Sequence, residues 1–280
     1  MDAAGIDVQV ISHTYPSVEL LEPAAAIPLA REANDLLAEA VALHPDRFCG
    51  FAALPTSDPK AAAQELERAV TQLGFKGALI NGRTRDRFLD GHDYWPILER
   101  AEDLDVPLYL HPGLPPAAVR EAYYSGLSPL ANHWLSIAAW GWHVETGLHA
   151  LRLIAAGAFD RFPRLQVVIG HMGEAIPFML DRTNLTLSKE ASGLERTVKE
   201  YFQHNFHVTT SGFFSNAPLL CLLEAIGPDR TIFSVDYPYS TNQEGRAFLD
   251  NAPIDPADRE KIAHGNAERL LKLGATIGSG

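Results

Sequence analysis

Residues 106–113 read VPLYLHPG, and the fold that we expect follows from this stretch. Val106–Leu110 is a short apolar run, long enough for a buried strand and too short for a helix. His111 stands at the carboxyl end of the run, and Pro112-Gly113 stops the strand directly after it. The stretch therefore predicts a buried strand that presents a histidine at its tip.

Two later stretches repeat this arrangement. LQVVIGHMGE, residues 165–174, places His171 after an apolar run, and RTIFSVDYPY, residues 230–239, does the same with Asp236. In parallel barrels, the catalytic residues lie at the carboxyl ends of the strands. Three strands that each present a metal-binding side chain at the same end therefore indicate the mouth of such a barrel.

Strand and helix patterns alternate along the whole chain, which implies a parallel sheet with helical crossovers. The expected strands are Ile6–Ser12, Phe48–Leu54, Phe75–Ile80, Val106–His111, Leu165–Gly170, Phe206–Thr210 and Thr231–Val235. The expected helices are Pro23–Leu43, Lys60–Leu73, Tyr94–Leu104, Glu145–Phe159, Glu174–Thr186, Pro218–Ile226 and Pro256–Leu273.

An α/β fold, the (β/α)8 TIM barrel, fits this alternation, but it needs eight strands and we count seven. We expect one barrel domain over residues 1–274, with an aromatic-rich insertion at about 114–143 and a tail at 275–280. A doubly wound open sheet is the less favoured alternative, because no glycine-rich fingerprint follows the first strand.

Composition excludes several classes of partner. The net charge of −12 argues against binding to nucleic acid or to an anionic membrane, since both attract basic surfaces. No apolar run reaches the ~18–20 residues that span a bilayer, and the start of the chain is not the basic start of a signal peptide. The only cysteines, Cys49 and Cys221, lie in apolar surroundings, which argues against a disulfide framework. We expect a cytoplasmic protein.

The three side chains at the strand tips are candidate metal ligands. A divalent ion binds histidine nitrogens and carboxylate oxygens that are held rigidly, with one position left open for water or substrate. His111, His171 and Asp236 fit this need. A single histidine of this kind is more often a hydrogen-bonded structural residue, so the metal-site hypothesis depends on all three together.

Residues 141–182, GWHVETGLHALRLIAAGAFDRFPRLQVVIGHMGEAIPFMLDR, resemble the amidohydrolase superfamily. The similarity is to its branch of metal-dependent, non-oxidative decarboxylases, which act on γ-resorcylate, 2,3-dihydroxybenzoate, 5-carboxyvanillate and aminocarboxymuconate semialdehyde. The motifs GALING (77–82), YLHPG (109–113), FSVDYPY (233–239) and HGNAERLL (264–271) fit the same pattern in the same order. The resemblance therefore covers nearly the whole chain.

The resemblance implies a role for each matching residue. His111 and Asp236 are expected to bind the metal, and Asp236 also to take part in proton transfer. His171 is expected to be the acid/base group, with Glu174 orienting it. Arg182 is expected to serve the substrate carboxylate or the subunit interface beside it.

The start of the chain departs from the branch, which begins with a strand carrying Glu-x-His or His-x-His. The opening MDAAGID matches only after that strand, so the missing strand is expected to be the first. Either the start is truncated or this member has lost two ligands. His13 is a candidate substitute ligand, although a rim position is the more ordinary interpretation.

Three further features carry weaker expectations. Tyr239 is expected to stack on an aromatic ring or to pack within its loop, and Asn81 to face the substrate or to form a turn with Gly82. The insertion Ala117–His143 forms either a lid over a flat substrate or a subunit interface. Its aromatic residues are Tyr123, Tyr124, His133, Trp134, Trp140, Trp142 and His143.

Together these features predict a carboxy-lyase acting on a hydroxylated aromatic or related unsaturated acid. It would use one divalent ion, zinc or manganese, without an organic cofactor. A metal-dependent hydrolase of a lactone or similar small carboxylated ring is the alternative, and a catalytically silent barrel is a third. The resemblance also implies a homodimer or homotetramer. The only other partner expected is a small aromatic carboxylate.

Overall fold

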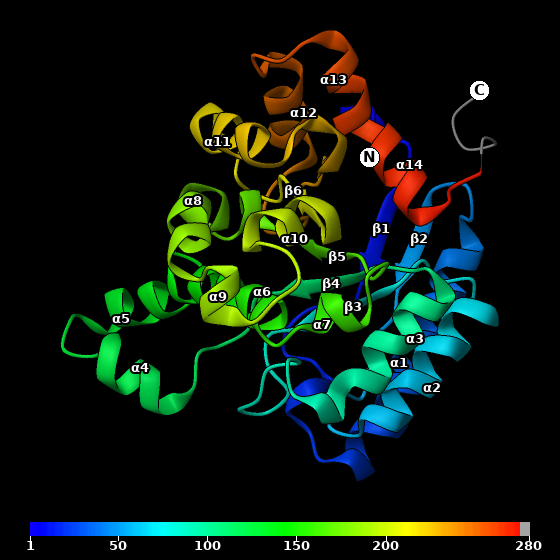
Figure 1. Ribbon diagram of the computed structural model, residues 1–280. Helices are drawn as coiled ribbons and strands as arrows, with labels where there is room; N and C mark the ends of the chain where they lie inside the picture. Colours follow the sequence, from blue (N-terminus) through cyan, green and yellow to red (C-terminus); the bar gives the residue numbers. More distant parts are fainter. Residues whose placement is uncertain (275–280) are drawn as a thin grey trace.

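The computed structural model describes residues 1–274, so the expected tail at 275–280 lies outside the described residues. The strands lie at the centre and the helices surround them, while α4 and α5 protrude from the body (Figure 1). The strands are β1 (Gln9–Ser12), β2 (Phe48–Phe51), β3 (Ala78–Asn81), β4 (Leu108–His111), β5 (Val167–Ile169), β6 (Phe206–Thr209) and β7 (Thr231–Ile232).

Fourteen α-helices and several short helical turns connect these strands within residues 1–274. The α-helices are α1 (Pro23–Leu43), α2 (Pro59–Thr71), α3 (Trp95–Leu104), α4 (Ala117–Tyr123), α5 (Pro129–Ser136), α6 (Gly141–Ala155), α7 (Ala158–Arg161), α8 (Ile176–Thr186), α9 (Lys189–Ser192), α10 (Val198–Asn205), α11 (Asn216–Ile226), α12 (Asn242–Asn251), α13 (Pro256–Glu260) and α14 (Asn266–Leu271). None of these helices is both long enough and apolar enough to cross a membrane.

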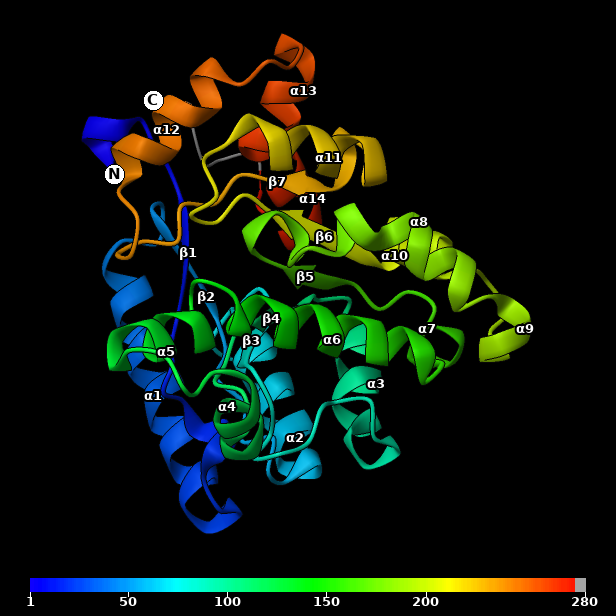
Figure 2. The ribbon, with the colours of Figure 1, turned by 90° about the vertical axis from the view of Figure 1, so that its left-hand side faces the viewer.

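All the strand pairs are parallel and follow the order of the chain. β1 pairs with β2, and β3 to β7 form one sheet in sequence order. A single bridge between Ala52 and Ala78 joins the two sheets. Within the described part of the chain, no ladder joins β7 back to β1, which stand at the two ends of the strand order (Figure 2). The predicted α/β barrel with one open strand position is therefore confirmed.

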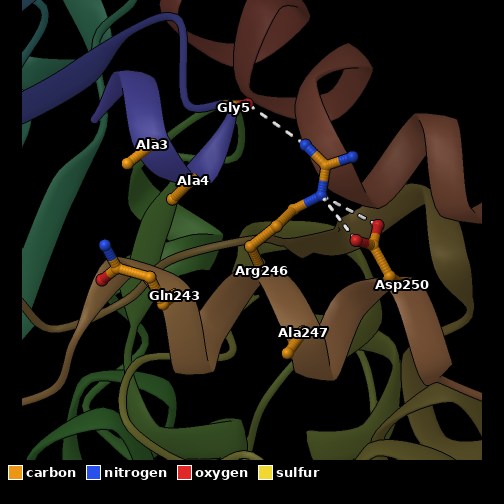
Figure 3. A pocket seen from close by; sticks show the side chains of 7 residues that line it. All are labelled: Ala3, Ala4, Gly5, Gln243, Arg246, Ala247 and Asp250. Carbon is orange, nitrogen blue, oxygen red and sulfur yellow. Dashed lines mark hydrogen bonds and ion pairs between the residues drawn. The ribbon is translucent and has the colours of Figure 1, made fainter.

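The open position is bridged by side chains. Arg246 of α12 donates from Nη1 to the carbonyl oxygen of Gly5 at 3.2 Å and from Nε to Asp250 at 2.8 Å (Figure 3). Gln9 of β1 donates to Asn242 Oδ1 at 3.1 Å. These bonds hold Gly5 and β1 against α12. A shallow cavity of about 380 Å³ lies beside Arg246. Because the Arg246 guanidinium already binds Gly5 and Asp250, this cavity is not a ligand site in our interpretation.

The alternation of β4 decides which side chains reach the barrel interior. Leu108 and Leu110 pack outward in the main hydrophobic core with helix residues. Tyr109 packs inward with Phe51 of β2. Since successive side chains of a strand point to opposite faces, His111 follows Tyr109 onto the interior side. The strand that was predicted from VPLYLHPG thus delivers His111 to the mouth.

The local signals were right for some elements and incomplete for others. Asp58 caps α2 by accepting from the backbone N–H groups of Lys60 and Ala61, as predicted. The expected helix Glu145–Phe159 is wrong in extent, because Gly157 at φ 74° separates α6 from α7. The expected helix Pro256–Leu273 contains a π-helical turn at Lys261–Gly265.

Helix α12 was not expected, although its start carries a clear signal. Thr241 and Glu244 form a capping box, in which each side chain accepts from the other residue's backbone N–H. The short helices α4, α5 and α9 were also missed. Four to eight residues give too few turns for an apolar periodicity to stand out.

Asn34 of α1 provides a test of how the helices are held on the barrel. Its amide is buried and makes two hydrogen bonds to the backbone of Ala53, at 2.8 and 3.0 Å, and one to Glu65 at 2.7 Å. We expect Asn34→Ala to lower the free energy of unfolding by about 1–3 kcal/mol for each buried group left unpaired. Urea unfolding measures this change.

The matched control is Asn251→Ala, which removes one exposed bond to the carbonyl of Ala247. Its free energy of unfolding should change by about 0.5 kcal/mol or less. Equal losses in the two variants would contradict the role assigned to Asn34.

Candidate active site

The site lies at the carboxyl ends of the strands. His111 ends β4 and pairs in register with Asn81, which ends β3. His171 follows β5 after one glycine, and Asp236 lies in the loop that follows β7. These residues come from four strands of one parallel sheet, so their side chains meet at one end of the barrel.

The structure brings four of the predicted residues together. The imidazole of His171 donates from Nδ1 to Glu174 Oε1 at 2.7 Å. Its Nε2 lies 3.8 Å from Asp236 Oδ2. The ring centroids of His111 and His171 are 6.2 Å apart. His171 therefore stands between a carboxylate that fixes one nitrogen and a second carboxylate that faces the other.

The backbone that carries His171 and Glu174 is strained. Five successive residues have positive φ: His171 at 50°, Met172 at 56°, Gly173 at 88°, Glu174 at 54° and Ala175 at 65°. A left-handed conformation costs roughly 1–2 kcal/mol for each residue with a Cβ atom. The expected helix Glu174–Thr186 is therefore wrong at its start, and α8 begins at Ile176.

Asp236 has the same kind of backbone, with φ at 68°. Strained residues persist only where the surroundings fix them, and they gather at functional sites. The fold thus holds an unfavourable backbone conformation at His171, Glu174 and Asp236, and this conformation fixes the direction of each side chain.

A layer of hydroxyl groups lies next to the site. Tyr109 shares hydrogen bonds with Thr209 at 3.0 Å and with Ser211 at 3.3 Å. Burial raises the pKa of Tyr109 to about 12, so its hydroxyl stays protonated. A Cβ atom on Gly170 would lie 2.8 Å from the Tyr109 oxygen, so any larger residue there would displace the Tyr109 hydroxyl. The layer is polar, neutral and closely packed.

His111 has a defined tautomer. Its Nδ1 lies 3.0 Å from the carbonyl oxygen of Pro112, which only accepts hydrogen bonds, so Nδ1 carries the proton. Burial, with help from the charge of His171, lowers the pKa of His111 to about 4. The ring is therefore neutral at pH 7, with a free lone pair on Nε2. A neutral imidazole with its other nitrogen fixed is what a metal ligand requires.

Glu174 and His171 form a buried ion pair. Burial by itself raises the pKa of Glu174, but the neighbouring charges of His171 and His143 outweigh burial and lower it. Burial lowers the pKa of His171, but Glu174 and Asp236 outweigh it and raise that pKa to about 10. The pair is therefore an imidazolium beside a carboxylate, arranged to deliver a proton from Nε2.

His143 is the member of this cluster that sequence reasoning missed. The sequence placed it at the end of the aromatic insertion, whereas the structure places it in the first turn of α6 beside Glu174. His143 Nδ1 lies 2.6 Å from Glu174 Oε2. Donor atoms of His143, His171 and Glu174 all lie within 4.8 Å of one another. Its partner Glu174 lies 31 positions later in the chain, so no local spacing pointed to this contact.

The remaining candidates lie around the cluster rather than in it. Asn81 is buried, its N–H donates to Glu19 Oε1 at 2.8 Å, and its Oδ1 has no hydrogen-bond partner within residues 1–274. Tyr239 is 70% exposed. Arg182, on α8, and His13, after β1, are also exposed. These three exposed side chains therefore lie at the surface, whereas His171 and Glu174 are buried.

Comparison with known proteins identifies the chain. The sequence profile of the family described as amidohydrolase matches residues 1–273. The chain belongs to the amidohydrolase family. A γ-resorcylate decarboxylase from Rhodococcus jostii (strain RHA1) is 43% identical over 287 residues, which cover 98% of this chain and 85% of that protein. The predicted resemblance to the decarboxylase branch is therefore confirmed.

Solved structures agree with the assignment. The crystal structure of 2,6-dihydroxybenzoate decarboxylase from Rhizobium has a TM-score of 0.89 at 40% identity, covering 98% of this chain and 86% of that chain. The dihydroxybenzoic acid decarboxylase from Polaromonas sp. JS666, solved with manganese and the inhibitor 2-nitroresorcinol, has a TM-score of 0.91 at 40% identity. There the match covers 98% of this chain and 84% of that chain.

Gly147 provides a test of how closely α6 must approach the strained segment. A Cβ atom at this position would lie 2.7 Å from the backbone oxygen of Glu174. We expect Gly147→Ala to lower the free energy of unfolding by about 1–3 kcal/mol, because the added methyl group overpacks this contact. Thermal or urea unfolding measures the effect.

Gly265→Ala is the matched control, since a Cβ atom there would meet only the Glu260 oxygen, at 3.8 Å. It should leave the stability unchanged or raise it slightly. If Gly147→Ala behaved like Gly265→Ala, the close approach would not constrain the site.

Proposed function

We propose that this protein is a metal-dependent, non-oxidative decarboxylase of a hydroxylated aromatic acid, a carboxy-lyase. The observation that carries the proposal is the His171 imidazole. Glu174 binds its Nδ1 at 2.7 Å, and its Nε2 faces Asp236 at the barrel mouth. An imidazole held in this way can deliver a proton to one fixed point. The similarity to γ-resorcylate and 2,6-dihydroxybenzoate decarboxylases supports a small aromatic carboxylate as the substrate.

The donor set fits one divalent ion. The neutral Nε2 of His111 and the carboxylate of Asp236 are the two ligands that we propose from this chain. Manganese is favoured because a relative at 40% identity was solved with it, and zinc fits the same nitrogen and oxygen donors. When bound, such an ion supplies Lewis acidity and a template for the substrate carboxylate and its ortho hydroxyl.

The residues of the chain would then act as follows. His171, or Asp236 in its place, protonates the ring carbon that bears the carboxylate, and this breaks the aromaticity of the ring. The carbon–carbon bond to the carboxylate then breaks, its electron pair restores the aromatic ring, and carbon dioxide leaves. Glu174 keeps the proton on His171 Nδ1, so that Nε2 is the nitrogen that reacts. General acid catalysis of this kind contributes ~10²–10⁴-fold.

The surrounding residues have proposed roles in binding. The unpaired, buried Oδ1 of Asn81 is suited to accept a hydrogen bond from a substrate hydroxyl. Tyr239 and Arg182 are exposed, so we propose that they meet the substrate only when the site closes or when a second copy of the chain covers them. We also propose that residues 1–274 act as one domain and that the protein works in the cytoplasm.

The first test is the release of carbon dioxide from 2,6-dihydroxybenzoate by the protein supplied with manganese or zinc. We expect His171→Asn to abolish turnover and to leave the metal content nearly unchanged, because His171 is proposed as the acid and not as a ligand. Asp236→Asn should weaken metal binding at least tenfold, because it replaces a charged ligand. Elemental analysis and a carbon dioxide assay give both readouts.

Wild-type turnover by His171→Asn would show that the acid is wrongly assigned. Hydrolysis of a lactone without any release of carbon dioxide would favour the hydrolase hypothesis. A protein that binds no metal and acts on neither substrate would favour the silent barrel.

An exposed apolar surface supports association with a second copy. Val144 and Leu148 of α6 are exposed, and so are Phe178, Met179 and Leu185 of α8. Large exposed apolar patches often mark interfaces between proteins. We therefore propose a homodimer or homotetramer that covers them.

We expect Phe178→Glu to shift the protein toward monomer, because Phe178 is 82% exposed and a buried unpaired carboxylate is costly at an interface. Sedimentation velocity measures the shift. The control is Leu43→Glu on α1, 76% exposed and remote in sequence from both helices. A wild-type protein that sediments as a monomer would contradict the proposal.

A further inference from the structure

One buried carboxylate serves two imidazoles in this site. Glu174 receives His171 Nδ1 on Oε1 at 2.7 Å and His143 Nδ1 on Oε2 at 2.6 Å. The Glu174 side chain has no exposed surface, so these two rings take the place of water around it. Both oxygens are thereby fixed, and the carboxylate cannot rotate without losing a bond.

The outer nitrogen of His143 is also engaged. Its Nε2 lies 2.9 Å from the carbonyl oxygen of Ala138, in the turn between α5 and α6. A carbonyl oxygen only accepts hydrogen bonds, so Nε2 carries a proton. Nδ1 faces the carboxylate of Glu174. His143 is therefore held at both nitrogens.

The packing of α6 produces this contact. Gly147 lies one helical turn after His143 on the same face, and it lets α6 touch the backbone oxygen of Glu174. Phe213 closes the other side, with its ring centroid 5.3 Å from that of His143 and 5.7 Å from that of His171. His143 thus meets the carboxylate of Glu174 while Gly147 meets its backbone.

The short distances favour hydrogen bonds over a shared metal ion. Two donors on one zinc ion each lie roughly 2.0–2.2 Å from it, and the tetrahedral angle then keeps them more than about 3 Å apart. The nitrogen–oxygen distances to Glu174 are 2.6 and 2.7 Å. These are the distances of charge-assisted hydrogen bonds.

We propose that His143 is a positioning residue that holds the second carboxylate oxygen of Glu174, next to the oxygen that His171 binds, and so keeps the His171 imidazole aimed at the barrel mouth. The inference rests on the proposed function, in which His171 is the acid. It also connects the aromatic insertion to the proposed acid through a chain of hydrogen bonds. The Ala138 carbonyl belongs to that insertion and fixes His143, which fixes Glu174, which in turn fixes His171.

The test compares two variants of His143. His143→Phe keeps a ring against Phe213 but removes both donors, whereas His143→Gln keeps one amide donor for Glu174. We expect His143→Phe to lower kcat for 2,6-dihydroxybenzoate by ~10–100-fold with KM little changed, as found for other residues that orient a reacting group. His143→Gln should recover most of that loss, which a purely space-filling role would not produce.

Three further readouts keep the outcome clear. His133→Phe, an exposed histidine in the same insertion, should retain wild-type kcat. The metal content of His143→Phe should equal that of the wild type, and a loss of metal would overturn the proposal in favour of a ligand role. Wild-type kcat in His143→Phe would also overturn it.

The last readout does not require turnover. In ¹⁵N-labelled metal-free protein, the imidazole N–H signals of His143 should be protected from exchange, and His143→Phe should shift the Nδ1–H signal of His171. An unshifted His171 signal would overturn the positioning role. If the wild type releases no carbon dioxide, the proposed decarboxylation fails, yet these spectra still decide whether His143 positions Glu174.

Discussion

The site depends on the buried charge of Glu174. A carboxylate without exposed surface is stable only if hydrogen bonds and opposite charge replace its hydration. His171 supplies both on one oxygen, and His143 supplies a hydrogen bond on the other. Because His171 follows β5 and His143 belongs to α6, their hydrogen bonds to Glu174 hold the end of β5 and the start of α6 next to each other. The orientation of the acid/base nitrogen follows from that arrangement.

A strained backbone and a dense core make the same arrangement rigid. The left-handed run that carries His171 and Glu174 lies directly after β5, whose Val167 and Ile169 are buried in the main core. The unfavourable φ angles persist because the core on one side and α8 on the other leave the segment little room to relax. The packing of the buried strands thus offsets the unfavourable backbone energy of the segment that carries His171 and Glu174.

Much of the fold could be read from local signals. Short apolar runs predicted all seven strands, and three of them were recognised by the polar residue at their tips. The ends of the strands were predicted less well, because a strand ends where its hydrogen bonds to the neighbouring strand end, and the sequence does not show this. Ile6–Val8 and Phe233–Val235 look like strand, but the open position of the barrel leaves them without ladder partners within the described residues. Helix α12 was missed despite its capping box.

By itself the sequence determined the alternation of strands and helices and the position of His111 at a strand tip, and the family resemblance implied the short-range pair His171–Glu174. Each of these depends on residues that are close in the chain or on a regular repeat. Only the tertiary structure decided that His143 meets Glu174, 31 positions away, and that Asp236 faces His171. Such contacts depend on how α6 packs against the segment after β5, and on the position of β7 beside β6 in the same sheet. No local pattern encodes that packing, because it depends on residues that are far apart in the chain.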